Sequence, residues 1–405
     1  MSKTKGVVNV ICSLLLVPIV QSEESLGDAI SNGATQLDLR MRYEQVDQNA
    51  PINLDADALT LRTRLNYLTS SYQGFKSFVE FDDVSTLGID DYNSTTNGQG
   101  DKAKIVDPVG TEVNQAWVSY KNGETYFKWG RQRIILDNQR FVGGVGFRQN
   151  EQTYDGFSIT NSSFENTNIF YANVHSVNRI FGKEGVGGAK GDHKSDTDLL
   201  NIKYEGLPLS TLVGYAYLID NQDNSRFSTD TYGIRYQGKL RDLNYILEYA
   251  SQRESGKNSL KYKADYILAE MSYQVDDVAL TFGYEVLGSD SGDAAFITPL
   301  ATGHKFQGWS DQFLVTPGEG IADVYFSADT NFDDIKLLAS YHHFKADQNN
   351  IIGHDDLGHE INLSATKKIG IFTVNVKYAS YSAGDVSFGK SDTDKLWLTV
   401  STVLK

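Results

Sequence analysis

Four arginines lie close together in a short stretch of the chain that also contains several glycines. They are Arg131, Arg133, Arg140 and Arg148, with Gly130 and Gly143 among them. A guanidinium group can pair with both oxygens of one carboxylate, so this stretch has the chemistry of an anion-binding loop. Glycine allows the tight backbone path that such a loop needs. The stretch therefore predicts a surface that binds carboxylates.

Further charged residues alternate with apolar ones in extended segments. Between residues 37 and 44 each apolar residue is followed by a charged one, which gives a strand one apolar and one ionic face. The basic members of the ionic faces are Arg40, Arg42, Arg62, Arg64, Lys128, Arg235, Lys336 and Lys377. The acidic members are Asp38, Glu44, Glu80, Asp82, Glu248, Glu270, Glu285 and Glu360. These charges either select solutes in a water-filled pore or pair with one another and only stabilise its wall.

A scaffold of strands must position these charges, and the same alternation recurs along the whole chain. The alternating segments are joined by short turns and long loops in turn, and the long loops are expected at residues 83–110, 131–154, 176–197 and 289–320. A barrel in a membrane turns apolar side chains to lipid and polar ones to water. We therefore predict an all-β fold, a transmembrane antiparallel β-barrel of about 18 strands with short periplasmic turns and long extracellular or inward loops.

The N-terminal residues have the features of a secretory signal peptide. Lys3 and Lys5 precede an apolar run over residues 7–20, and cleavage is expected before Glu23. This divides the chain into a signal peptide, residues 1–22, and a single outer-membrane barrel domain, residues 23–405. The single cysteine, Cys12, falls in the signal peptide, so disulfides and thiolate sites are excluded from the mature chain.

Composition and motifs argue against several classes of function. The formal net charge is −15 at pH 7 and no basic patch is present, so no nucleic-acid partner is expected. The chain contains no Gly-x-Ser-x-Gly, His-Glu-x-x-His or phosphate-loop motif. We therefore expect no enzyme activity, no cofactor and no metal.

Three segments resemble the family of alginate-export outer-membrane porins. They are residues 130–156, residues 283–288 and, most specifically, residues 296–313, which read FITPLATGHKFQGWSDQF. The resemblance covers the chain from about Gln36 to its end. It implies an eighteen-stranded barrel with an arginine-rich constriction, gated by inward loops and a periplasmic turn.

The resemblance also implies which residues form that constriction. By motif position it assigns Arg131 and Arg148, whereas Arg40 and Arg62 follow by strand order with no motif to fix them. The full set of candidate pore residues is Arg131, Arg148, Arg133, Arg140, Arg40, Arg42, Arg62, Arg64 and Lys128. The candidate residues of the inward loop are His304, Lys305, Gln307, Trp309 and Asp311.

The expected function is passive passage of small hydrophilic or anionic solutes, such as carboxylates or sugars, across the bacterial outer membrane. The alternative is an export pore for an anionic exopolysaccharide such as alginate. Two weaker alternatives are an outer-membrane hydrolase barrel and a structural barrel plugged by residues 289–320. The expected partners are outer-membrane lipid and the hydrophilic solutes or anionic oligo- and polysaccharides themselves, and the resemblance implies a monomer.

Overall fold

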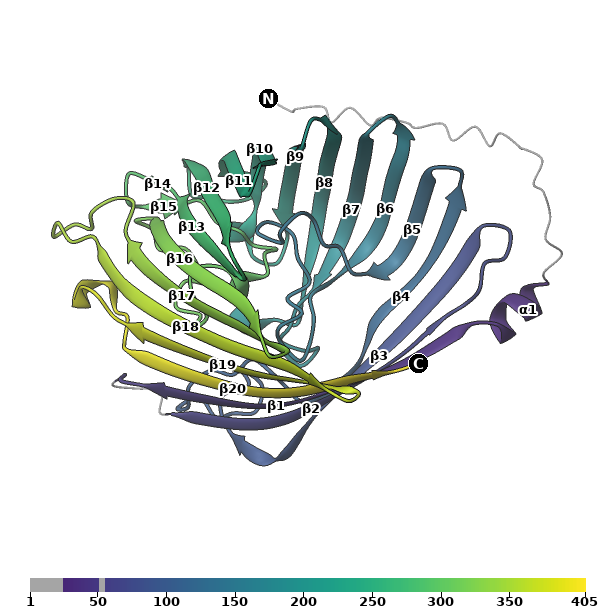
Figure 1. The fold of residues 1–405 in the computed structure, drawn as a ribbon, viewed down its shortest axis with the longest axis horizontal. Coiled ribbons are helices and arrows are strands. Elements are labelled where there is room, and N and C mark those ends of the chain that lie inside the picture. Colours follow the sequence, from purple (N-terminus) through teal and green to yellow (C-terminus); the bar gives the residue numbers. More distant parts are fainter. Residues whose placement is uncertain (1–24, 51–54) are drawn as a thin grey trace.

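Eighteen long strands form one closed antiparallel sheet in the computed structural model, which describes residues 25–50 and 55–405. Each barrel strand pairs with the barrel strands before and after it, and β1 (Ala34–Gln48) closes the ring against β20 (Thr393–Leu404). Figure 1 shows the strands following one another in colour around the lumen. The predicted β-barrel and its strand number are confirmed. The signal peptide expected over residues 1–22 lies outside the described residues.

The other elements follow in chain order. The remaining barrel strands are β2 (Ala56–Leu68), β3 (Phe75–Asp91), β4 (Gly110–Asn122), β5 (Thr125–Gln132), β6 (Thr153–Phe164), β7 (Thr167–Asn178), β8 (Asp192–Leu207), β9 (Ser210–Asn221), β10 (Thr229–Leu240), β11 (Leu243–Glu254), β12 (Lys263–Val275), β13 (Val278–Leu287), β16 (Ile321–Phe332), β17 (Ile335–Lys345), β18 (Asp356–Ile369) and β19 (Phe372–Ser382). The short elements are α1 (Leu26–Ser31), η1 (Gly187–Ala189), η2 (Ser225–Phe227), β14 (Ser289–Asp290), β15 (Ala294–Ala295), η3 (Gly303–Lys305) and η4 (Val386–Phe388). No helix in the described ranges is both long and apolar enough to cross a bilayer.

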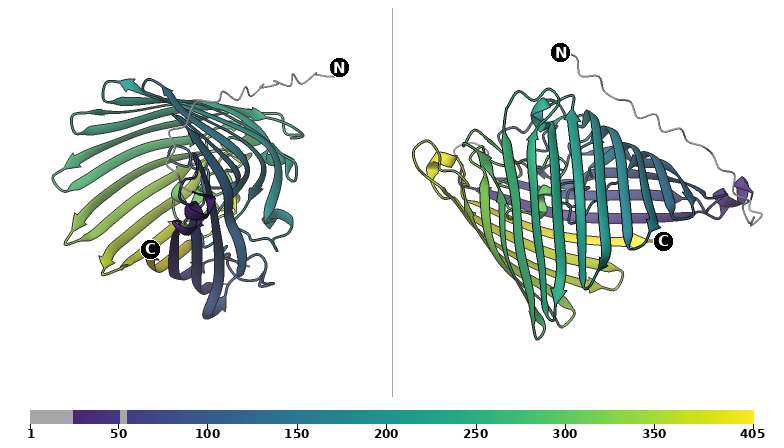
Figure 2. Two further views of the ribbon diagram at one scale, coloured as in Figure 1. Left: turned by 90° about the vertical axis from the view of Figure 1, so that its right-hand side faces the viewer. Right: turned by 90° about the horizontal axis from the view of Figure 1, so that it is seen from above.

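Alternation along the strands sorts the side chains onto two faces, as predicted. On β1, Met41 is 39% exposed on the outer face, whereas its neighbour Arg42 is only 3% exposed inside. The helix α1 and the C-terminus lie at the end of the barrel where the turns are short (Figure 2). The loops at the other end are longer, and two of them turn into the lumen.

Two strands are longer than the sequence predicts by six residues or more, so the loops beside them are shorter. β3 continues to Asp91 instead of ending near Asp82, and β8 begins at Asp192 instead of Asp198. The outer face of the β8 extension is polar, that of the β3 extension begins with Asp83 and Ser85 before Leu87 and Ile89, and the extensions are tied across strands, as where the Thr111 hydroxyl donates to Asp83 at 2.6 Å. The alternation of apolar and polar residues is weak there, and the sequence therefore indicated loops at 83–110 and 176–197.

Two inward segments fill part of the lumen. We call residues 133–152 the arginine loop and residues 288–320 the long loop. They join through a parallel bridge between Val142 and Leu300, and the Gly143 amide donates to the Leu300 carbonyl at 2.9 Å. Phe141 of the arginine loop packs on Phe296 of the long loop, so the two segments share one apolar core.

Candidate functional site

The inner faces of β1, β2 and β3 carry a buried cluster of paired charges. Arg64 donates to both oxygens of Asp82 at 2.5 and 2.6 Å and to Glu151 at 2.6 Å. Arg62 donates to Asp38 at 2.7 Å. Charge-assisted bonds of this kind are stronger than neutral ones and fix both partners. Pairing within the wall therefore accounts for Arg62 and Arg64.

Arg40 and Arg42 instead hold the backbone of the arginine loop. Arg40 donates to the Gly146 carbonyl at 2.8 Å, to the Gln149 side chain at 2.9 Å, and to the Arg148 carbonyl. Arg42 donates to the Phe147 carbonyl at 2.7 Å, and its guanidinium carbon lies 4.3 Å from the centre of the Phe147 ring. These partners are neutral, so the two arginines position the loop while keeping their positive charge.

Arg148 joins three parts of the molecule. Its guanidinium donates to Glu44 on β1 at 3.0 and 3.2 Å and to Asp311 of the long loop at 3.1 Å. The side chain is only 6% exposed. Arg148 thus lies in the lumen, as the resemblance implies, but its contacts make it a residue that fixes the loops to the wall.

Arg133 is the arginine of this loop that remains partly open to the lumen. Its side chain is 31% exposed and donates to Glu151 at 2.5 and 2.8 Å. Burial would raise the pKa of Glu151, but the guanidinium groups of Arg64 and Arg133 outweigh burial and lower that pKa to about 2. Glu151 therefore stays ionised between two arginines, and Arg64 can hold it if Arg133 turns to a solute.

Arg131 lies outside the lumen, which corrects its assignment to the constriction. On β5, Phe127, Trp129 and Arg131 alternate onto one face, and Trp129 is 61% exposed on the outer surface. Arg131 donates to both oxygens of Asp155 on β6, at 2.8 and 3.0 Å. Strand geometry sends every second side chain to the same side, so Arg131 faces away from the pore.

Arg140 and Lys128 lie inside. Arg140 is buried, with a nitrogen 2.8 Å from Glu285 on β13 and its guanidinium carbon 4.7 Å from the Phe306 ring centre. Lys128 lies with its ammonium 4.5 Å from the Trp117 ring centre. Arg140 thus fixes the arginine loop to β13, whereas Lys128 faces open space.

The inward-loop motif docks the long loop onto its surroundings. His304 Nδ1 lies 2.8 Å from Asp311 and Nε2 lies 2.9 Å from the Lys377 ammonium. Because an ammonium only donates, Nε2 accepts and the ring proton stays on Nδ1, which donates to Asp311. Burial, followed by the Lys377 charge, lowers the pKa of His304 to about 3 although Asp311 opposes this. His304 is therefore neutral at physiological pH.

The other residues of this motif make docking contacts as well. Lys305 donates to the Asn138 carbonyl at 3.0 Å, and Gln307 donates to Glu285 at 2.5 Å. The Trp309 ring centre lies 3.8 Å from the Lys377 ammonium. Asp311 accepts from Lys395 at 3.1 Å as well as from Arg148. The five residues together fix the long loop between the walls.

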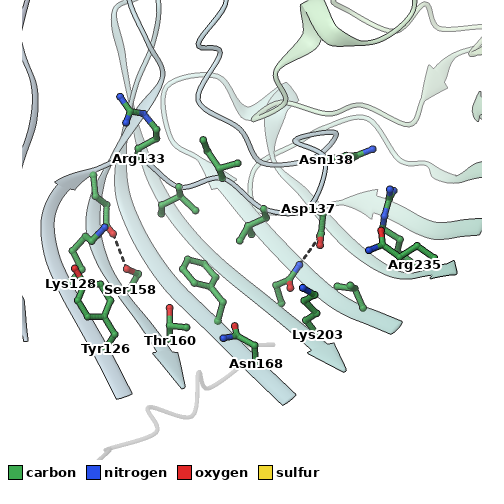
Figure 3. Close-up of a pocket in the computed structure, with 18 residues that line it drawn as sticks. Tyr126, Lys128, Arg133, Asp137, Asn138, Ser158, Thr160, Asn168, Lys203 and Arg235 are labelled. Atoms are coloured by element: carbon green, nitrogen blue, oxygen red, sulfur yellow. Dashed lines mark hydrogen bonds between the residues drawn. The ribbon is translucent and has the colours of Figure 1, made fainter. Parts of the chain in front are cut away.

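A cavity of about 590 Å³ lies between the arginine loop and the inner faces of β5 to β10 (Figure 3). Among the described residues that line it, four are cationic and one is acidic. The cations are Lys128, Arg133, Lys203 and Arg235, and the acid is Asp137. Asparagine, glutamine, serine and threonine side chains complete much of the lining, so the cavity offers hydrogen bonds and positive charge together.

A second cavity of about 230 Å³ lies between the arginine loop and Thr302 of the long loop. Arg133 and Ile135 line both cavities, so these two side chains form the partition between them. Arg133 thus lines both cavities, whereas Arg131 and Arg148 line neither of them.

Some lining residues were missed in the sequence. Lys203 and Asn201 are two positions apart on a predicted strand, and alternation alone would have placed both on its ionic face. Asp137 and Glu151 lie in the arginine loop, where no periodic pattern indicates direction. Within the described ranges, no three His, Cys, Asp or Glu side chains gather so as to hold a metal ion.

Comparison with known proteins gave one family and many similar folds. A family model described as alginate export matches residues 33–379. No curated protein sequence matches the chain. Acinetobacter baumannii OccAB2 has a TM-score of 0.73 at 16% identity, and Pseudomonas aeruginosa OccK9 (OpdG) has 0.70 at 16%; each alignment covers 93% of this chain and 99% of the other. Pseudomonas aeruginosa OpdK, solved with vanillate, has 0.69 at 14%, with the same coverage. At these identities the structural likeness establishes the fold alone.

Proposed function

The chain belongs to the alginate-export family and is a channel-type β-barrel of the bacterial outer membrane, and on that premise we propose that it passes small hydrophilic solutes bearing a carboxylate. The resemblance predicted from the sequence is thereby confirmed at the level of family and location. The choice of solute rests on the charges and polar groups of the lumen described above.

One observation carries the proposal, namely the charge balance of the larger cavity. Its lining has four cationic side chains against the single carboxylate of Asp137, which accepts from Asn201 at 2.8 Å. Three of the cations also pair with carboxylates outside this lining, Arg133 with Glu151, Lys203 with Glu205 and Arg235 with Glu248, so Lys128 and the exposed part of Arg133 contribute most to the positive charge. Cations that converge on a confined aqueous space raise the local concentration of anions. The neutral polar lining suits the hydroxyl groups of a sugar acid or another hydroxylated carboxylate. The likeness to OpdK, solved with vanillate, agrees with a carboxylate as solute.

Arg133 is the residue that this proposal tests most directly. Purified protein in a planar bilayer should open discrete conducting steps, and its reversal potential in a potassium chloride gradient should show a preference for chloride. Arg133→Gln should move that potential toward cations, because Arg133 lines both cavities. Arg131→Gln is the matched control, since Arg131 lies on the outer face and should leave the potential unchanged. A protein without conducting steps, or an equal shift in both variants, would overturn the proposal.

Export of an anionic polysaccharide is a second candidate, and the family match favours it. A polymer, unlike a small acid, is long enough to contact both of the cavities that Arg133 lines. Current recordings with oligomers of a polyuronate and with a monomeric uronate separate the two functions. Transient block by the monomer alone favours the small solute, while translocation events whose duration grows with oligomer length favour export.

A further inference from the structure

Two other strands of the barrel, β13 and β18, carry buried carboxylates on their inner faces, and the long loop covers them. Glu285 on β13 and Glu360 on β18 lie on the inner face and are 3% and 0% exposed. Arg140 lies against Glu285 at 2.8 Å. The hydrogen bonds recorded for Glu360 come from neutral groups of the long loop. A carboxylate that is buried needs such donors, because an unpaired buried charge is strongly destabilising.

A short part of the long loop, residues 303–311, supplies these donors. The Ser310 amide donates to Glu360 at 3.1 Å, and the Trp309 amide and the Ser310 hydroxyl also donate to it. Gln307 donates to Glu285 at 2.5 Å. In the opposite direction, Asp311 accepts from Arg148 and from Lys395 on β20. The segment therefore contacts the carboxylates of β13 and β18 with donors, and the cations of the arginine loop and β20 with a carboxylate.

Gly308 allows the backbone to approach Glu360 this closely. Its φ is +79°, in the left-handed region that favours glycine, and a Cβ placed on it would overlap the carboxylate of Glu360. Any other residue at this position would force the segment and the carboxylate apart. The contact thus depends on a glycine in the middle of the segment.

We propose that residues 303–311 act as a mask: they cover the carboxylate of Glu360, so that the ion selectivity of the lumen is set by the cationic cavity. The proposal rests on the proposed channel function and adds the element that sets its charge preference. Neutral donors satisfy the carboxylate without cancelling its charge, but the segment keeps ions from approaching it closely, so its removal would let Glu360 attract cations into the lumen. The segment is thus a specificity-determining part of the channel in addition to being a filler.

Replacement of the segment tests the mask without changing net charge. Residues 303–311 contain one lysine and one aspartate, so an equal number of glycine and serine residues leaves the formal charge of the chain unaltered. The chloride-to-potassium permeability ratio should fall by about threefold, the Boltzmann factor for one newly exposed charge a few ångströms from an ion in water. Glu360→Gln should restore the ratio in the replaced protein and leave it nearly unchanged in the intact one. Equal effects of Glu360→Gln in both backgrounds would overturn the mask.

A single substitution gives the same test with less disturbance. Gly308→Ala should separate the segment from Glu360 and lower the permeability ratio in the same direction. Gly292→Ala is the matched control, because Gly292 lies in the same loop with φ +85° but a Cβ placed on it would have no atom within 4 Å. Equal permeability ratios in the two variants would contradict the proposal.

Chemical labelling tests the mask without any current through the pore. In a Cys12→Ser background, Glu360→Cys places one thiol beneath the segment. A water-soluble maleimide should label this thiol at least about tenfold faster when residues 303–311 are replaced, because exposure governs thiol reactivity. Equal labelling rates would overturn the mask even if the barrel conducts, whereas a faster rate in a barrel that does not conduct would contradict only the channel function.

Discussion

On the wall formed by β1, β2 and β3, buried arginines meet carboxylates, whereas on β18 the buried carboxylate of Glu360 accepts its hydrogen bonds from neutral donors and faces His342 of the neighbouring strand. Arg64 lies between Asp82 and Glu151, at 2.5 and 2.6 Å. Glu360 accepts from the amides of Trp309 and Ser310 and from the Ser310 hydroxyl. Buried charges are thus stabilised by ion pairs on β1, β2 and β3 and by neutral hydrogen-bond donors on β18.

The comparison of the two walls shows that a buried charged group can have all its hydrogen bonds satisfied without having its charge balanced. An ion pair within the wall has little net charge, whereas neutral donors satisfy the hydrogen bonds of an acid and leave its charge unbalanced. The ion pairs of β1, β2 and β3 are therefore largely structural, and the arginines of these strands that bind carbonyl groups instead are Arg40 and Arg42. A difference in stability cost between the walls should follow, since breaking an ion pair strands its partner.

The largest effect is expected where one arginine holds both a wall and a loop. Arg148→Met would leave the buried carboxylate of Glu44 without its guanidinium partner. Loss of one member of a buried ion pair typically destabilises by about 3–5 kcal/mol. Thermal and urea unfolding of the barrel in detergent micelles would measure the loss, and early proteolysis within residues 133–152 would localise it.

Arg131→Met provides the control for that loss. Arg131 also donates to both oxygens of a carboxylate, but its side chain is 33% exposed on the outer face. An exposed pair contributes about 1 kcal/mol or less. If the two variants lost equal stability, burial would not be what distinguishes the lumen pairs, and the comparison of the walls would fail.

The next effect concerns the segment that bridges the walls and depends on pH. The folded-state pKa of His304 is about 3, below its ordinary value of 6.5, and the ring faces Asp311, Lys377 and Arg148. When residues 303–311 are detached from the barrel wall, His304 binds a proton below pH 6.5, whereas in the folded position it stays neutral down to about pH 3. The attachment of the segment is therefore strongest above pH 6.5 and weakens as the pH falls. The free energy that holds the segment in place falls by about 1.4 kcal/mol per pH unit, which gives about 2 kcal/mol between pH 6.5 and pH 5.

Hydrogen exchange of residues 288–320 at pH 7 and pH 5, corrected for the intrinsic rate of exchange, would measure this weakening. His304→Gln keeps a donor and an acceptor but cannot titrate in this range. The pH dependence of protection should therefore disappear in the variant. The same slope in both proteins would show that another group is responsible.

Much of the barrel follows from the sequence because alternation is a local signal. The eighteen strands needed only the period of two along the chain, and the same period places residues such as Arg42 and Glu44 on the inner face. The same signal also contained the correction for Arg131. β5 extends two residues further than predicted, to Gln132, and the series Phe127, Trp129, Arg131 then places the arginine outside.

The contacts of the loops could not be read in this way. Glu151 and Asp311 lie in segments without regular alternation, and their partners are distant in the chain, as Arg148 is from Asp311. A family motif located His304 and Asp311 in an inward loop but did not indicate that they would bind Lys377 and Arg148. Long-range pairing of loop charges depends on the three-dimensional path of the backbone, which a single sequence does not reveal.

The smallest effect compares one carboxylate from each wall after the same change. Glu44→Gln places a side-chain amide against the Arg148 guanidinium, which keeps the carboxylate of Asp311 as a partner, so we expect a cost of about 1.5 kcal/mol, below that of Arg148→Met. Glu360→Gln keeps a carbonyl acceptor for the Trp309 and Ser310 amides, and its amide can donate to the Ser310 hydroxyl, so we expect a cost below about 1 kcal/mol. Thermal unfolding of both variants in the same detergent would rank them. A larger loss of stability in Glu360→Gln would mean that β18 needs the charge of this carboxylate for stability. The distinction between ion-paired carboxylates and carboxylates held by neutral donors would then be wrong.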